Sequence, residues 1–99
     1  MPHEVWIGPV RVTALEHCLV LSPGDRAWVE VLVGATSELD FDAQVRQALT
    51  QYQLQLDGFG ARERVRDRAT PLERTAQRLE KELTKRAGVR LMTFRPIPA

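Results

Sequence analysis

The arginines between Ala61 and Thr70 are the residues whose type and spacing most clearly suit chemistry. In ARERVRDRAT, arginine occupies every second position: Arg62, Arg64, Arg66 and Arg68. Alternate side chains on a β-strand share one face and lie about 6.6 Å apart, close to the phosphate repeat of an extended strand. This spacing predicts binding of RNA or single-stranded DNA, helped by Arg74 and Arg78. The alternative is a solvated strand or loop, because charge runs usually face water.

Glu16, His17 and Cys18 form the one cluster that resembles catalytic machinery. A cysteine nucleophile needs a nearby base that converts the thiol to a thiolate. Neighbouring side chains on a strand point to opposite faces, so His17 and Cys18 cannot pair directly. A buried Cys18 that packs as a small hydrophobe is the expected role. We therefore predict no catalytic residue and no enzymatic activity.

Metal and cofactor motifs are poorly supported. One cysteine and two histidines, His3 and His17, do not make a structural zinc set. Asp40 and Asp42 lack an EF-hand loop and suit helix capping better. The GFG segment at 58–60 lacks the remainder of a dinucleotide fingerprint, and no Walker sequence is present. No metal and no cofactor are expected.

Composition indicates one small globular domain over residues 1–99. The hydrophobic fraction is 43% and the charged fraction 27%, both ordinary for a folded domain. No apolar run approaches the roughly 20 residues of a spanning helix, and no signal peptide is visible, so no membrane contact is expected. The single cysteine, Cys18, excludes an internal disulfide and fits a reducing cytoplasm.

Charge is distributed unevenly along the chain, although the net charge is only +1. Met1–Gly60 has three Lys and Arg against eight Asp and Glu, whereas Ala61–Ala99 has eleven against five. Such asymmetry indicates a nucleic-acid or membrane-surface partner, mutual neutralisation inside the fold, or head-to-tail pairing of two copies, and mutual neutralisation is the favoured interpretation.

The first half of the chain predicts strands followed by a helix. EVWIGPVRV alternates apolar residues, but Gly8-Pro9 predicts either an edge strand or two short strands. CLVL, SPGD and RAWVEV predict a β-hairpin, in which the third segment is the clearest strand of the chain. A helix is predicted from about Asp40, with Ser37 or Asp40 at its N-terminus.

The second half predicts a hairpin, a helix and a strand. In LQL the apolar residues recur at every second position, which is typical of a strand, and Asp57-Gly58 predicts a hairpin turn. The second hairpin strand would place Arg62, Arg64 and Arg66 on one face. Thr70 is the expected N-cap of a helix that ends near Gly88, and VRLMTF is the expected last strand.

The order of elements from Ala27 onward is strand, helix, strand, strand, helix, strand. This is the split βαβ order of the ferredoxin-like fold. We predict an α+β fold with an antiparallel sheet, two helices on one face and an N-terminal β-hairpin extension. If the Arg62 segment is a loop, the order becomes βαβαβ with a partly parallel sheet.

These patterns favour a non-catalytic protein–protein interaction module, such as a small adaptor, inhibitor or immunity-type protein. Its partner is another protein or a second copy of the chain. Trp6 and Trp28 are the predicted apolar anchors, because both lie in the N-terminal strands and aromatic residues dominate binding energy at interfaces. Nucleic-acid binding by the Arg62–Arg68 row is the alternative.

Overall fold

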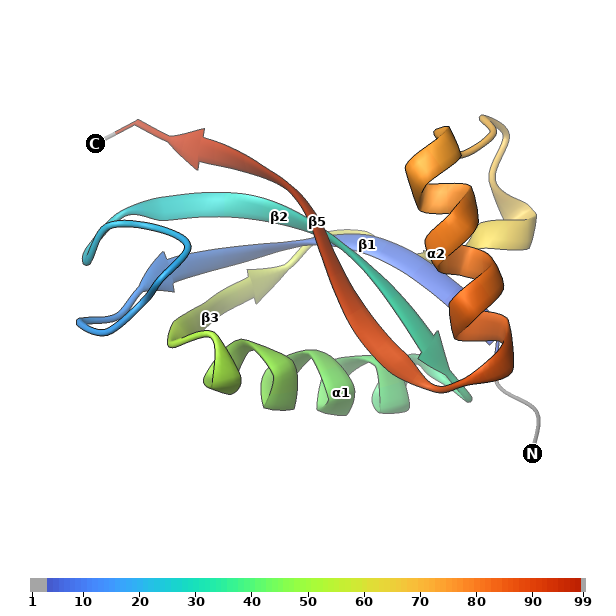
Figure 1. Cartoon of the computed structure of the whole chain (residues 1–99), viewed down its shortest axis with the longest axis horizontal. Helices are drawn as coiled ribbons and strands as arrows, with labels where there is room; N and C mark the ends of the chain where they lie inside the picture. The colour runs from blue at the N-terminus through green and yellow to red at the C-terminus, as the bar shows by residue number, and fades with distance from the viewer. Residues whose placement is uncertain (1–3, 99) are drawn as a thin grey trace.

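The computed structural model describes residues 4–98, which form an α+β domain with an antiparallel sheet and two helices (Figure 1). The strands are β1 (Glu4–Ala14), β2 (Arg26–Ala35), β3 (Leu54–Phe59), β4 (Glu63–Arg64) and β5 (Gly88–Ile97). The helices are α1 (Glu38–Gln51) and α2 (Arg74–Lys85), and a 3-10 turn, η1, covers Val65–Asp67. All four pairs of neighbouring strands are antiparallel, as expected.

The N-terminal strand β1 lies inside the sheet, whose order is β3-β1-β2-β5. It pairs with β2 from Glu4 opposite Ala35 to Thr13 opposite Arg26, without interruption at Gly8-Pro9. The prediction of an edge strand or two short strands was therefore wrong. Pro9 is tolerated because the outer partner of β1 changes here: β4 pairs with Trp6–Ile7, and β3 pairs with Val10–Ala14.

The ferredoxin-like order is not confirmed, because β1 lies beside β2 instead of forming an extension outside the sheet. The physical reason is visible in the side chains of β1. Val5 and Ile7 are buried on one face, while Val10 and Val12 are buried on the other. A strand that is apolar on both faces suits the middle of a sheet that is covered on both sides.

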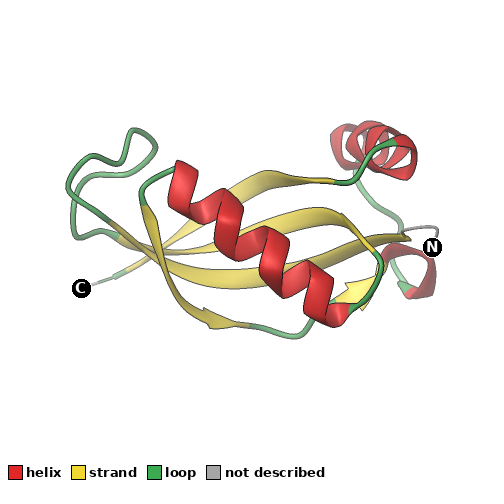
Figure 2. Cartoon of the chain, turned by 90° about the horizontal axis from the view of Figure 1, so that it is seen from below, coloured by secondary structure: helices red, strands yellow, loops and turns green. Residues whose placement is uncertain are grey.

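The two helices lie on opposite faces of the sheet, not on one face as predicted (Figure 2). Phe41, Val45 and Leu49 of α1 pack against the face that carries Val10 and Val29. Ala76 and Leu83 of α2 pack against the other face. Both faces of the sheet are apolar, so each face needs a helix to shield its side chains from water.

Local signals succeeded at some element ends and failed at others. Ser37 caps α1, and its side chain accepts a hydrogen bond from the Asp40 backbone N–H. The prediction that CLVL, residues 18–21, is the first strand of a hairpin was wrong, because this segment lies in the loop between β1 and β2. The hairpin strand is β1, which ends at Ala14, and hydrogen bonds between Ala14 and the Gly24–Asp25 turn close the hairpin.

Two predictions in the second half were also wrong. Asp57-Gly58 lies within β3, at an irregularity opposite Arg11–Val12, instead of forming a hairpin turn. The second helix begins at Arg74, four residues after the expected N-cap Thr70, and Glu73 stands at its N-cap.

Candidate interaction surface

The Arg62–Arg68 row does not lie on one strand face. Only Glu63 and Arg64 are in β4, and η1 follows at once. The 3-10 turn rotates successive side chains away from the two-residue alternation of a strand. The predicted row of three guanidinium groups on one face is therefore absent.

Each arginine of the row lies close to a carboxylate. Arg62 Nη2 is 3.1 Å from Asp42 Oδ2. Arg64 and Arg66 both lie 2.9 Å from the carboxylate of Glu4. Arg68 lies 3.6 Å from Glu63 and 4.0 Å from Glu30. Acidic residues of the first half of the chain thus pair with the first basic segment of the second half. Part of the opposite charge of the two halves is therefore cancelled inside the fold.

Two of these arginines also cover aromatic rings of the core. The guanidinium of Arg62 lies 5.0 Å from the ring centroid of Phe59, and that of Arg64 lies 5.2 Å from the ring of Trp6. These distances are within the range of cation–π attraction. Arg62 and Arg64 therefore have packing roles, whatever else they contact.

The two tryptophans occupy different environments. Trp6 is 7% exposed and belongs to the α1-side core, and its indole N–H has no hydrogen-bond partner among the described residues. Trp28 is half-buried on the other face of the sheet. Trp28 lies opposite Arg95 in the sheet register, and the guanidinium of Arg11 lies 5.9 Å from its ring. Of the two predicted anchors, only Trp28 offers surface to a partner.

The β5 strand forms an edge of the sheet and lies at the front in Figure 1. It pairs with β2, and its outer side pairs with no strand in the described part of the chain. At ten residues it is long for an edge strand. Unpaired backbone N–H and C=O groups along such an edge are a template for another strand.

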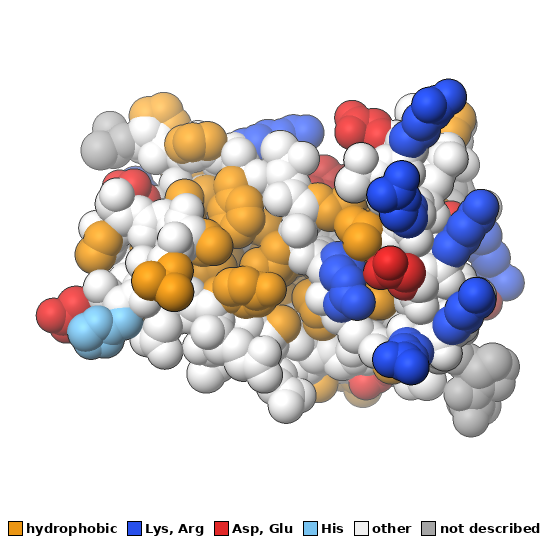
Figure 3. Space-filling view, viewed as in Figure 1, with side chains coloured by type: hydrophobic (Ala, Val, Ile, Leu, Met, Phe, Trp, Pro, Cys, Tyr) orange, Lys and Arg blue, Asp and Glu red, His pale blue; other side chains and the backbone are white. Residues whose placement is uncertain are grey.

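Half-buried apolar side chains adjoin this edge on the α1 side. Val89, Leu91 and Phe94 lie on this face of β5, with a register irregularity between Leu91 and Phe94, and they are partly buried against the core. Leu21, from the loop after β1, extends the same cluster. Figure 3 shows apolar side chains gathered across the middle of this view of the molecule. The edge is therefore bordered by apolar surface that a partner can cover.

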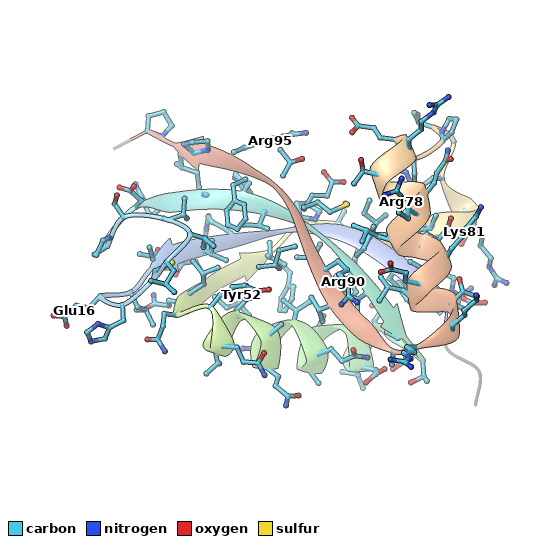
Figure 4. All side chains as sticks on the ribbon, in the orientation of Figure 1. Glu16, Tyr52, Arg78, Lys81, Arg90 and Arg95 are labelled. Carbon is cyan, nitrogen blue, oxygen red and sulfur yellow. The ribbon has the colours of Figure 1, made fainter. Side chains whose placement is uncertain are left out.

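The other face of β5 carries positive charge. Arg90 and Arg95 are exposed and stand opposite Leu32 and Trp28 of β2 (Figure 4). Arg90 lies 3.8 Å from Glu82 of α2, and Arg95 has no ion-pair partner among residues 4–98. A partner strand at this edge would meet two guanidinium groups.

The Glu16-His17-Cys18 cluster lies in the loop between β1 and β2. His17 is exposed, whereas Cys18 is partly buried and packs against the core, as expected of a small hydrophobe. Within residues 4–98, no group of three or more His, Cys, Asp or Glu side chains is arranged to hold a metal ion. His3 lies outside the described residues.

Arg74 and Arg78, the predicted helpers in nucleic-acid binding, lie exposed on α2. No ion pair involves either of them within residues 4–98, whereas the members of the Arg62–Arg68 row contact carboxylates of β1, β2, β4 and α1. The sequence reasoning missed Lys81 and Lys85, which continue the Arg74–Arg78 spacing along the helix. It also missed the edge of β5, because no local pattern reports which strand ends a sheet.

No protein-family model matches the chain, and neither a curated protein nor a solved structure is significantly similar to it. None of the helices in the described region has the length and apolar character needed to cross a bilayer.

Proposed function

We propose that the chain is a non-catalytic protein–protein interaction module that accepts an extended strand of a partner protein along β5. The observation that carries this proposal is the ten-residue edge strand, unpaired on its outer side in the described chain and flanked by Val89, Leu91 and Phe94. Strand addition draws affinity from main-chain hydrogen bonds and specificity from alternate side chains.

The arginines of β5 disfavour a second copy as the partner. In a two-fold antiparallel pairing that sets Leu91 opposite Phe94, Arg90 of each copy stands opposite Arg95 of the other. Like charges directly opposite each other destabilise a strand pair. Charged side chains on an edge strand are a common protection against self-association.

The same arginines favour a partner strand of opposite charge. A segment with apolar residues opposite Leu91 and Phe94, and carboxylates opposite Arg90 and Arg95, would satisfy both faces of β5. Trp28 lies beside Arg95 on the charged face and remains the proposed aromatic anchor. No contact is assigned to Trp6, since its ring is buried in the core.

An adaptor, inhibitor or immunity-type role in the cytoplasm belongs to this proposal. It rests on the small size of the domain and the single cysteine, Cys18. The alternative, nucleic-acid binding by the Arg62–Arg68 row, has less support because each of those arginines already lies within 4.0 Å of a carboxylate.

The proposal is tested with a labelled peptide of residues 87–98 that carries Arg90→Glu and Arg95→Glu. This peptide has the apolar spacing of β5 and carboxylates where β5 has guanidinium groups. Titration of the intact protein, followed by fluorescence anisotropy, is expected to show saturable binding that weakens as salt rises.

The matched control is the same peptide with its natural Arg90 and Arg95. It keeps every apolar residue but faces the protein with like charges, so its affinity is expected to be at least about tenfold lower, a difference of about 1.4 kcal/mol. Equal binding of the two peptides, or binding of neither, would contradict the proposal.

A further inference from the structure

One side of α2 carries a continuous row of cations, which we call the α2 stripe: Arg74, Arg78, Lys81 and Lys85. The spacings of four, three and four residues place these side chains within about 60° around a helix of 3.6 residues per turn. All four are exposed. The row extends about 16 Å along the helix axis, at 1.5 Å per residue.

The α2 stripe is not neutralised inside the fold. None of its four members forms an ion pair with any carboxylate in residues 4–98, in contrast with Arg62, Arg64, Arg66 and Arg68. Figure 3 shows the resulting cluster of basic side chains over α2, and Figure 4 labels Arg78 and Lys81 on it. Four of the cations of the second half that have no ion-pair partner within residues 4–98 therefore lie together on one side of this helix.

The arrangement works against the stability of the helix. Arg74 with Arg78, and Lys81 with Lys85, are like charges four residues apart, which repel each other on a helix surface. Arg74 is the first residue of α2, where the helix dipole disfavours a cation. A surface selected only for solvation has no need of these repulsions, so an external anion is a reason for them.

The buried side of α2 argues against a lipid surface as that anion. Ala76 and Leu83 are buried in the core, and Leu72 and Leu79 pack against the same cluster. The helix therefore has no apolar face left to insert into a bilayer, as amphipathic membrane-binding helices require. Neighbouring cations of the stripe are about 5–6 Å apart at their Cβ atoms, which suits a ligand with closely and regularly spaced anions.

We propose that the α2 stripe binds the phosphate backbone of nucleic acid. A nucleic-acid strand supplies such regular anions without any requirement for base sequence. This site differs from the Arg62–Arg68 row and lies on a different element from β5, so it is independent of the proposed strand addition.

The test is fluorescence anisotropy of a labelled DNA duplex of about 20 base pairs with the intact protein over a range of salt concentrations. Four phosphate contacts predict a slope of about −3.6 in a plot of log affinity against log salt. In the variant Arg78→Gln/Lys81→Gln, which removes two contacts, the slope is expected to fall to about −1.8 and the low-salt affinity at least about tenfold.

Arg64→Gln/Arg66→Gln is the matched control, since it removes the same charge from the Arg62–Arg68 row. It is expected to leave the slope near that of the unaltered protein. The proposal is overturned if the duplex does not bind at low salt, if both double variants lose affinity equally, or if anionic vesicles bind and the duplex does not.

Discussion

At the scale of single residues, partner and burial distinguish arginines that look equivalent in the sequence. Arg62 has a side chain only 21% exposed, lies 3.1 Å from Asp42 and covers the ring of Phe59. Arg66 is 63% exposed and contacts Glu4 at the surface. The two ion pairs have similar distances, but the Arg62–Asp42 pair contributes more to the free energy of unfolding, because water screens the exposed Arg66–Glu4 pair far more.

Arg62→Gln is expected to lower the free energy of unfolding by about 1–3 kcal/mol, because it leaves Asp42 without its charged partner and uncovers Phe59. Arg66→Gln is the control and should change stability by less than about 0.5 kcal/mol. Urea denaturation followed by circular dichroism measures both. Equal effects of the two substitutions would show that Arg62 has no special role in packing.

The two tryptophans provide a second contrast at this scale. Trp6→Ala removes a buried ring from the core and should cost about 3–5 kcal/mol of unfolding free energy. Trp28→Ala should cost clearly less, because part of that ring already faces water. Thermal unfolding of both variants checks the order, and a larger loss for Trp28→Ala would contradict it.

At the scale of elements, a close approach of the segment between β3 and β4 to Gly8-Pro9 of β1 separates the two short strands. Gly60 donates its backbone N–H to the Pro9 carbonyl at 2.8 Å. A Cβ at Gly60 would lie 2.5 Å from Pro9 Cγ, and a Cβ at Gly8 would lie 2.9 Å from Arg62 Cβ. The absence of a Cβ atom at Gly8 and Gly60 allows this close approach.

Gly60→Ala is expected to destabilise the protein by about 1–3 kcal/mol, since the new methyl group overlaps the ring of Pro9. Gly58→Ala is the matched control two residues away. There the nearest atom to the new Cβ is Arg11 Nη2, at 3.5 Å and on a flexible side chain, so the change should be small. Denaturant midpoints of the two variants test this close approach, and equal midpoints would argue against it.

Element identity was largely readable from the sequence, whereas element neighbours were not. Ser37 as the cap of α1 and the alternating RAWVEVLVG of β2 are local signals, and both predictions were confirmed. The position of β1 inside the sheet depends on strands more than 40 residues away, such as β3 and β4. The carboxylates that neutralise Arg62 and Arg64 are also remote in sequence: Asp42 lies 20 residues from Arg62, and Glu4 lies far from Arg64 at the start of β1.

The α2 stripe was readable in principle but only in part recognised. Arg74 and Arg78 were predicted as helpers of the Arg62–Arg68 row, although their spacing continues to Lys81 and Lys85 along the same helix. What the sequence could not show is which arginines have carboxylate partners. The Arg62–Arg68 row is paired with carboxylates and is therefore structural, whereas the α2 stripe is unpaired among residues 4–98 and therefore available to a ligand.

At the scale of the whole molecule, charge and apolar surface are separated into distinct regions. The Arg62–Arg68 row is paired internally, the α2 stripe is unpaired, and β5 combines an open edge with apolar and basic flanks. Because the arginines of β5 oppose self-pairing, the isolated chain is expected to be a monomer in low salt. Raising the salt concentration should screen these charges and so weaken the repulsion between the β5 arginines of two copies.

The most direct test of the central claim is the light-scattering mass of an equimolar mixture of the unaltered protein and its Arg90→Glu/Arg95→Glu variant. Each protein alone is expected to have the mass of a monomer, because each β5 would meet like charges in a copy of itself. In the mixture, every Arg90 and Arg95 can stand opposite a glutamate, so the mass should rise toward twice the monomer value. A variant with Arg78→Glu/Lys81→Glu, which carries the same charge change on α2, should not produce this rise. A mixture that remains at the monomer mass, or an unaltered protein that already forms dimers through β5, would contradict the account.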